Sequence, residues 1–273
     1  DKASVARVNL APWYDKMAAG DVPDAIEGHF PFNDAICDAV LEVSPKVISF
    51  HFGLPDPALV ERVRQAGIVV LSSATSVAEA IWLADRGVDA VIAQGYEAGG
   101  HSGWFLRRGA SNVAGTMALV PRMADAVDVP VIAAGGIADG RGIAAALMLG
   151  AAGVQIGTAF LTTPESMVAP VHKAQLLGAS GDDTMLSKAF SGRSARTVVN
   201  DYASAMDEVR DWPDFPLVNA MTGPLRKTSA ENGKPDAVAL WSGQAVGLNR
   251  EATTAETVGR LVEETAACLK GFS

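Results

Sequence analysis

The sequence repeats a strand-and-helix pattern over its first 160 residues, and this repetition limits the fold more than any other feature. Each unit begins with a short apolar run, passes through a polar or Gly-rich turn, and continues into a stretch with helical periodicity. Continuous apolar runs are typical of parallel strands buried on both faces. Six runs predict strands, at residues 6–11, 46–53, 67–73, 89–95, 130–136 and 153–160. The alternation predicts an α/β fold with a parallel sheet.

Two of the predicted helices begin with a capping box, in which a Ser or Thr is followed three residues later by Glu. Ser76 and Glu79 form one box, and Thr253 and Glu256 form the other. In this motif the hydroxyl accepts from the backbone of the first turn, while the carboxylate reaches back to the cap residue. The predicted helices cover residues 76–86, 140–149 and 255–270.

The composition excludes several classes of function. The formal net charge is −9 and the isoelectric point is near 4.9, whereas nucleic acids and anionic lipid surfaces attract basic faces. Cys37 and Cys268 provide neither a disulfide framework nor the spacing of a metal site. No apolar run approaches the roughly 20 residues that span a bilayer, and the first residues show no secretory pattern. We therefore expect a soluble cytoplasmic protein without a bound metal, a nucleic-acid partner or a membrane partner.

Polar residues and glycines gather where the predicted strands end. They are Asn9, His51, Gln94, Gly135, Gly136, Gly157 and Thr158. In a (β/α)8 barrel this rim carries the chemistry, and the loops after the last two strands hold phosphate. The last two strands found here precede Gly-rich turns that open onto helices, where backbone N–H groups can hold an anion. Alternatively, these glycines form tight turns that bind no ligand.

The strand-and-helix pattern stops near Leu177, after six strands, whereas a closed barrel needs eight. The region that follows is rich in loops. We expect a barrel domain at residues 1–178 and 253–273, and a smaller cap or substrate region at residues 179–252, packed over the rim.

The stretch AQGYEAGGHSGWF, residues 93–105, places His101 directly after two glycines. Glycines allow a backbone to approach a ligand closely, and histidine is the side chain that titrates nearest neutral pH. A solvated surface loop is the alternative. Glu97, in the same stretch, is expected to fix the shape of the loop by accepting hydrogen bonds from backbone N–H groups.

Taken together, these segments resemble the class I nitronate monooxygenases over nearly the whole chain. The most specific segments are residues 93–105, 129–166, SGRSARTVVN (191–200) and LWSGQAVGL (240–248). The resemblance implies a TIM-type (β/α)8 barrel that binds FMN without covalent attachment. It also implies that alkyl nitronates are oxidised by O2 to a carbonyl compound and nitrite.

In the light of this resemblance, the segment VNLAP (8–12) is similar to the third strand of the family's barrel. The first two strands are not recognisable in this chain. We expect a preceding segment that carries them to be missing from the sequence, because a barrel without two strands would expose two sheet edges.

The resemblance also implies roles for the residues at the rim. His101 is the expected active-site base, which takes the α proton of a nitroalkane or, when protonated, holds the anionic nitronate. The expected FMN contacts are Asn9, Gln94, Gly99, Gly135, Gly136, Gln155, Ile156, Gly157 and Thr158. The expected substrate region comprises Ser102, Trp104, Ser242 and Gln244.

Two other functions stay open. An NAD(P)H-dependent flavin reductase, such as an enoyl-acyl-carrier-protein reductase, has the same barrel and a similar EAGGH loop. A non-enzymatic protein that binds a phosphorylated ligand is the second alternative. Segments 191–200 and 240–248 favour the oxygenase, whose partners are a small nitronate and O2. An apolar face of the barrel or cap would also allow a homodimer.

Overall fold

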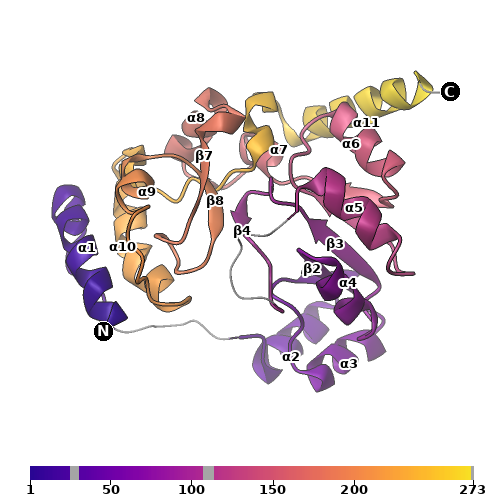
Figure 1. Ribbon diagram of the computed structural model, residues 1–273, viewed down its shortest axis with the longest axis horizontal. Helices are drawn as coiled ribbons and strands as arrows, with labels where there is room; N and C mark the ends of the chain where they lie inside the picture. The colour runs from indigo at the N-terminus through magenta and orange to yellow at the C-terminus, as the bar shows by residue number, and fades with distance from the viewer. Residues whose placement is uncertain (25–30, 107–113, 272–273) are drawn as a thin grey trace. The chain divides into compact units, whose positions relative to one another are not determined.

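The structure is a computed structural model that describes residues 1–24, 31–106 and 114–271 (Figure 1). The chain forms two compact units. Unit 1 consists of Asp1–His29, Ala98–His101 and Gly157–Arg260, and unit 2 of Phe30–Glu97, Ser102–Ile156 and Leu261–Ser273. These bounds differ from those of the barrel and cap expected from the sequence, a division that stays a prediction.

Unit 2 is built on a five-stranded parallel sheet with the strand order β1-β2-β3-β5-β6. The strands are β1 (Val47–Phe50), β2 (Val69–Ala74), β3 (Ala90–Gln94), β5 (Val131–Ala134) and β6 (Gly153–Gln155). The register places Gln94 beside Ala134, and Ala134 beside Gln155, so these strands end at one edge of the sheet. Five of the six predicted strands and the predicted α/β class are therefore confirmed.

Five helices accompany this sheet. They are α2 (Asp34–Val43), α3 (Pro57–Gln65), α4 (Val77–Ala84), α5 (Thr116–Ala124) and α6 (Gly140–Met148). Val91 and Ala93 of β3 are completely buried in the core of unit 2, together with Leu83 of α4 and Met123 of α5. Burial of both faces explains why the strands have continuous apolar sequences.

The final helix, α11 (Thr254–Lys270), confirms the second predicted capping box. The Glu256 carboxylate accepts from the backbone N–H and the hydroxyl of Thr253, and the Thr253 hydroxyl accepts from the N–H of Glu256. The first box is only half formed. The Ser76 hydroxyl caps α4 by accepting from the N–H of Glu79, but the Glu79 carboxylate binds Thr75 instead of Ser76.

Unit 1 combines helices with a three-stranded antiparallel sheet in the order β4-β8-β7. The strands are β4 (Gly100–His101), β8 (Ala195–Val198) and β7 (Thr184–Ser187). The α-helices are α1 (Lys2–Met17), α7 (Thr158–Leu161), α8 (Pro170–Gly178), α9 (Asp201–Ala205), α10 (Leu217–Glu231) and the first part of α11. Three short 3-10 helices are η2 (Gly181–Asp183), η3 (Pro235–Ala237) and η4 (Gln244–Leu248).

The strand predicted over residues 6–11 is wrong, because these residues lie in α1. The Asp1 carboxylate caps this helix by accepting from the N–H of Ser4 at 2.8 Å. The buried residues Leu10, Tyr14 and Met17 recur at helical spacing. A window of six residues ends before Tyr14 and Met17, so it cannot distinguish a strand from a buried helical face.

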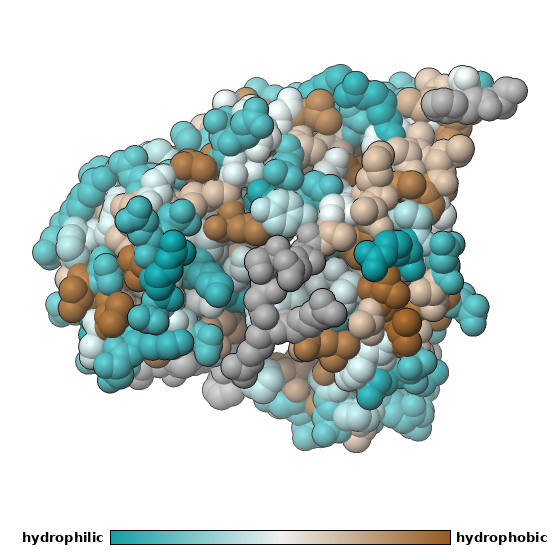
Figure 2. Space-filling model, viewed as in Figure 1, coloured by the Kyte–Doolittle hydropathy of each residue, from teal (hydrophilic) through white to brown (hydrophobic). Residues whose placement is uncertain are grey.

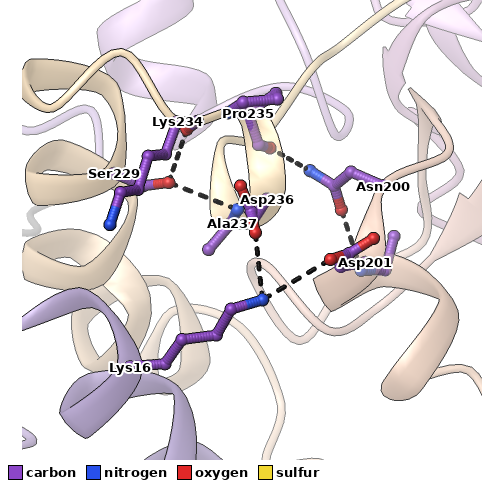
Figure 3. Close-up of polar contacts among 9 residues, drawn as sticks. Lys16, Asn200, Asp201, Ser229, Lys234, Pro235, Asp236 and Ala237 are labelled. Atoms are coloured by element: carbon purple, nitrogen blue, oxygen red, sulfur yellow. Dashed lines mark hydrogen bonds and ion pairs between the residues drawn. The ribbon is translucent and has the colours of Figure 1, made fainter.

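Polar contacts attach α1 to the rest of unit 1 (Figure 3). The Lys16 ammonium lies 2.9 Å from the Asp236 carboxylate and 3.4 Å from that of Asp201. The hydrogen bond from Lys16 holds the pKa of Asp236 below its ordinary value. The Tyr14 hydroxyl donates to the carbonyl of Met221 in α10 at 2.6 Å. Within the described residues, no helix is both long and apolar enough to cross a membrane.

Candidate active site

The end of β3 in unit 2 holds the loop that follows His101. Gln94 is 9% exposed, and its side-chain oxygen accepts from the N–H of Gly103 at 2.7 Å. A Cβ atom on residue 103 would lie 2.6 Å from the His51 ring, so only glycine fits there. Gln94, a predicted cofactor residue, therefore holds the glycine that lies between the predicted substrate residues Ser102 and Trp104.

Glu97 shapes the turn that follows β5. Its carboxylate accepts from the N–H of Thr116 at 2.8 Å and from the Thr116 hydroxyl at 2.9 Å. The same hydroxyl lies 2.8 Å from the carbonyl oxygen of Gly135. Glu97 thus accepts from the first residue of α5, which lies outside residues 93–105, so its expected role in fixing that loop stays a prediction.

The Gly135–Gly136 turn has a backbone that requires glycine. The φ angles of the two residues are 108° and 71°, both in the left-handed region. Gly136 is exposed, and its N–H makes no backbone hydrogen bond among the described residues. Gln155 is also exposed and follows the register of β5 and β6 to the same edge of the sheet, with Ile156 next to it. This edge of unit 2 therefore presents backbone and amide donors.

His101 lies in unit 1, in β4, where it pairs with Ala195 of β8. Its Nε2 atom is 2.8 Å from the Oγ atom of Ser191, a residue that is 1% exposed. The imidazole lies 5.3 Å from the Trp241 ring and 6.0 Å from the Phe215 ring, measured between centroids. The imidazole therefore contacts a buried hydroxyl and lies near two aromatic side chains.

The Ser191 hydroxyl can serve either protonation state of His101. It accepts from the N–H of Arg193 at 3.2 Å, and the carbonyl oxygen of Arg193 lies 3.1 Å away. A hydroxyl has one proton and can direct it to either acceptor. When the proton points to Arg193, Ser191 accepts from a protonated Nε2. When the hydroxyl rotates, it donates to an unprotonated Nε2.

Three further predicted residues come together around Gly243 in unit 1. The N–H of Gly243 donates to the Thr158 hydroxyl oxygen at 2.9 Å. A Cβ on residue 99 would lie 2.5 Å from the Gly243 nitrogen, so glycine at 99 permits two backbones to touch. Ser242 is fully buried, and its N–H donates to the carbonyl of Arg196 in β8. Gly99, Thr158 and Ser242 thus share one small region.

A buried histidine, His172, contacts the backbone of Trp241, whose ring lies beside His101. His172 is 6% exposed, and its Nε2 lies 3.2 Å from the carbonyl oxygen of Trp241. Burial lowers the pKa of His172, so the ring is neutral at pH 7 and donates its Nε2 proton to that carbonyl. The Trp241 ring is the one beside His101.

Asn9 does not lie at the end of a strand. It is on α1, and its side-chain amide donates to the Val5 carbonyl of the same helix at 2.8 Å. Gln244 begins η4 and is half-buried.

Sequence reasoning did not single out Ser191, Trp241 or Phe215. Ser191 and Trp241 lie within the segments that carry the family resemblance. Nothing in the spacing pairs either residue with His101.

Unit 2 has the parallel sheet of an α/β protein, with polar and glycine residues at its carboxyl edge. Unit 1 has a candidate active-site histidine that contacts a buried hydroxyl. The family model described as nitronate monooxygenase matches residues 10–264. The chain belongs to the nitronate monooxygenase family.

Curated relatives agree with this assignment. A probable nitronate monooxygenase of Staphylococcus aureus (strain JH9) is 42% identical over 210 residues, which is 76% of this chain and 59% of the relative. A probable nitronate monooxygenase of Staphylococcus saprophyticus is 43% identical over 217 residues, which is 78% of this chain and 61% of the relative. The chain therefore spans about three fifths of the length of these relatives.

Solved structures confirm the predicted TIM-type α/β fold class. A nitroalkane oxidase from Streptomyces ansochromogenes superimposes with a TM-score of 0.93 at 37% identity, covering 99% of this chain and 78% of the other. FabK from Thermotoga maritima gives a TM-score of 0.75 at 31% identity, covering 89% of this chain and 75% of the other.

Proposed function

We propose that the protein binds FMN and oxidises alkyl nitronates with O2 to a carbonyl compound and nitrite, with His101 as the active-site base. Membership of the nitronate monooxygenase family supports the proposal, as does the likeness to a nitroalkane oxidase. When bound, FMN would supply the electron transfer between the nitronate and O2. The residues of the chain bind and orient the reactants and move the proton.

The observation that carries the proposal is the pairing of His101 with Ser191. With the Ser191 hydroxyl directed to the carbonyl of Arg193, Nε2 of His101 keeps its proton and Nδ1 is the basic nitrogen. Nδ1 takes the α proton of a neutral nitroalkane. In the imidazolium that results, the Nε2–H group still donates to the Ser191 hydroxyl oxygen. The positive charge of the ring attracts the anionic nitronate.

The surroundings of His101 suit an apolar substrate with a charged head. The Trp241 and Phe215 rings offer an alkyl chain an apolar surface beside the imidazole. Ser102, Trp104, Ser242 and Gln244 remain the proposed substrate region.

Each unit offers donors of the kind that bind phosphate. In unit 2 the exposed Gly136 offers its backbone N–H. In unit 1 the exposed Gly157 has open space where a Cβ would be. Thr158 accepts from the N–H of Gly243, so its own hydroxyl proton can donate to an anion. Gln94, Gly99, Gly135, Gln155 and Ile156 complete the proposed FMN contacts. Asn9 is left out, because it lies on α1.

The first test is the visible spectrum of the purified chain, with the released cofactor identified. The proposal expects bound or bindable FMN, and loss of its yellow colour on anaerobic addition of ethylnitronate without nicotinamide. A chain that takes up no FMN would refute the proposal. Rapid bleaching by NAD(P)H, with no response to the nitronate, would replace it with the reductase alternative.

A glycine pair tests the phosphate contact. Gly157→Ala places a methyl group in open space at an ordinary φ of −108°, so the fold should be unchanged and FMN affinity should fall at least tenfold. Gly153→Ala is the matched control, because its Cβ also meets nothing within 4 Å. Equal FMN affinity in the two variants would remove Gly157 from the site.

Two substitutions test the proton transfer. His101→Asn should keep FMN and lose most activity on neutral nitroethane, with a smaller loss on preformed ethylnitronate. Ser191→Ala removes one hydrogen bond from His101 and should slow nitroethane turnover about tenfold. Ser191→Thr should restore much of that loss. Equal losses on both substrates would exclude the role of His101 as a base.

A further inference from the structure

A pocket of about 410 Å³ lies in unit 2, and none of its lining residues takes part in the candidate active site. Its walls come from the loop after β1, one face of α3 and one face of α4. The lining residues are Leu54, Pro55, Pro57, Val60, Glu61, Arg64, Trp82 and Arg86. The volume is in the range of pockets that hold small organic ligands.

The floor of the pocket is apolar. It is made of Leu54, Pro55, Pro57, Val60 and Trp82, and the α3 members follow helical spacing. Figure 2 shows hydrophobic residues at the surface over and beside α4. A floor of this kind binds an aliphatic chain by removing its surface from water.

Two guanidinium groups flank this floor. Arg86 lies over the Trp82 ring, 3.8 Å from its centroid, and donates to the Trp82 carbonyl at 3.1 Å. Arg64 lies against Gly87, where an added Cβ would be 3.0 Å from its Nη1 atom. Gly87 follows Arg86 directly, and both arginines line the pocket. Glu61 is 3.7 Å from Arg64 and more than half exposed, so it neutralises Arg64 weakly.

The wall behind Trp82 is held in place. The Phe105 ring meets the Trp82 ring edge-on at 5.1 Å. The N–H groups of Phe105 and Leu106 donate to the Glu79 carboxylate at 2.7 Å and 3.1 Å, and Glu79 is 1% exposed. A wall fixed in this way loses little conformational entropy when a ligand binds.

We propose that this pocket binds an aliphatic monocarboxylate of medium chain length. The chain lies on the apolar floor, and the carboxylate meets Arg64 and Arg86. Guanidinium groups recognise carboxylates through paired, charge-assisted hydrogen bonds. In a chain of net charge −9, two cations beside an apolar pocket favour an anionic ligand over a cationic one.

Calorimetric titration of the whole chain with hexanoate, octanoate and decanoate tests the proposal, with 1-octanol as the uncharged match. We expect one site per chain, and affinity rising about fourfold for each methylene group. Added salt should weaken octanoate binding and leave 1-octanol binding nearly unchanged.

Variants locate the site. Arg64→Gln and Arg86→Gln should each weaken octanoate binding about tenfold and leave 1-octanol binding unchanged. Arg122→Gln on α5 is the matched control, since Arg122 is exposed and lies outside the pocket. Both pocket arginines are at the surface, and circular dichroism checks that the variants fold.

Three results would overturn the proposal. They are octanoate binding that does not saturate at one equivalent, binding of 1-octanol as tight as that of octanoate, and the same octanoate affinity in all three arginine variants. Because no step depends on FMN or His101, these results are independent of the proposed oxidation.

Discussion

Glu79 is a buried carboxylate whose removal should destabilise unit 2. It is 1% exposed and accepts four hydrogen bonds. Two come from the N–H and the hydroxyl of Thr75, at 2.7 Å and 2.8 Å, and two from the N–H groups of Phe105 and Leu106. All four donors depend on this one side chain, so its truncation removes their acceptor.

The geometry sets the size of the effect. In Glu79→Gln one oxygen still accepts from Phe105 and Leu106, and the amide NH2 faces Thr75. The Thr75 hydroxyl can rotate and accept, but its N–H cannot, so one buried donor is left unsatisfied at a cost of about 2 kcal/mol. Glu79→Ala removes the acceptor of all four donors, of which those of Thr75 are buried, and we expect a loss of about 4 kcal/mol.

Urea unfolding followed by circular dichroism measures both losses as changes in the midpoint. Glu42→Gln is the control, because Glu42 is exposed on α2 and should change stability by less than about 0.5 kcal/mol. If Glu79→Ala unfolds at the wild-type midpoint, the four hydrogen bonds do not stabilise the native state and the reasoning fails.

Two further predictions concern unit 1. The pKa of His172 is lowered by burial, so the unfolded chain takes up a proton first as the pH falls below about 6.5. Stability should therefore decrease toward pH 5.5, by at most about 1.4 kcal/mol from this residue. His172→Gln should flatten the dependence of the urea midpoint on pH, and an unchanged slope would contradict the assignment. Tyr14→Phe removes the hydrogen bond to Met221 and should cost about 1 kcal/mol, read from the same midpoint. A variant as stable as the wild type would show that this bond adds nothing.

The parallel sheet was predictable because burial on both faces leaves an unbroken apolar run, as in β3. The helix α1 was not, since its apolar residues are spread over four turns and the six-residue window contained only part of them. Glu79 shows a different limit of prediction from the sequence. Its spacing from Ser76 predicts a capping box, but the donors of Phe105 and Leu106 lie more than 25 positions away. Tertiary contacts thus decided where the carboxylate binds.

The candidate site, like the fold, was only partly predictable from the sequence. Glycines and amides at strand ends are local sequence signals of a binding site. The segment around His101 could likewise be recognised from its own residues. The partner of His101 could not, because Ser191 is 90 positions away and comes close only through the pairing of β4 with β8. Serine is a common residue type, so one sequence contains no signal that selects this one.

Each unit is built from several separate segments of the chain, and this affects folding during translation. Unit 1 needs residues from Asp1 to Arg260, and unit 2 needs residues from Phe30 to Ser273. Neither unit is one continuous stretch, so neither can be complete on the ribosome until almost all of these residues have emerged. Nascent chains should therefore keep the apolar face of α1, which carries Leu10, Tyr14 and Met17, exposed until its partners in α10 have emerged. We expect this protein to depend on chaperones more than a protein of equal size whose domains follow one another along the chain.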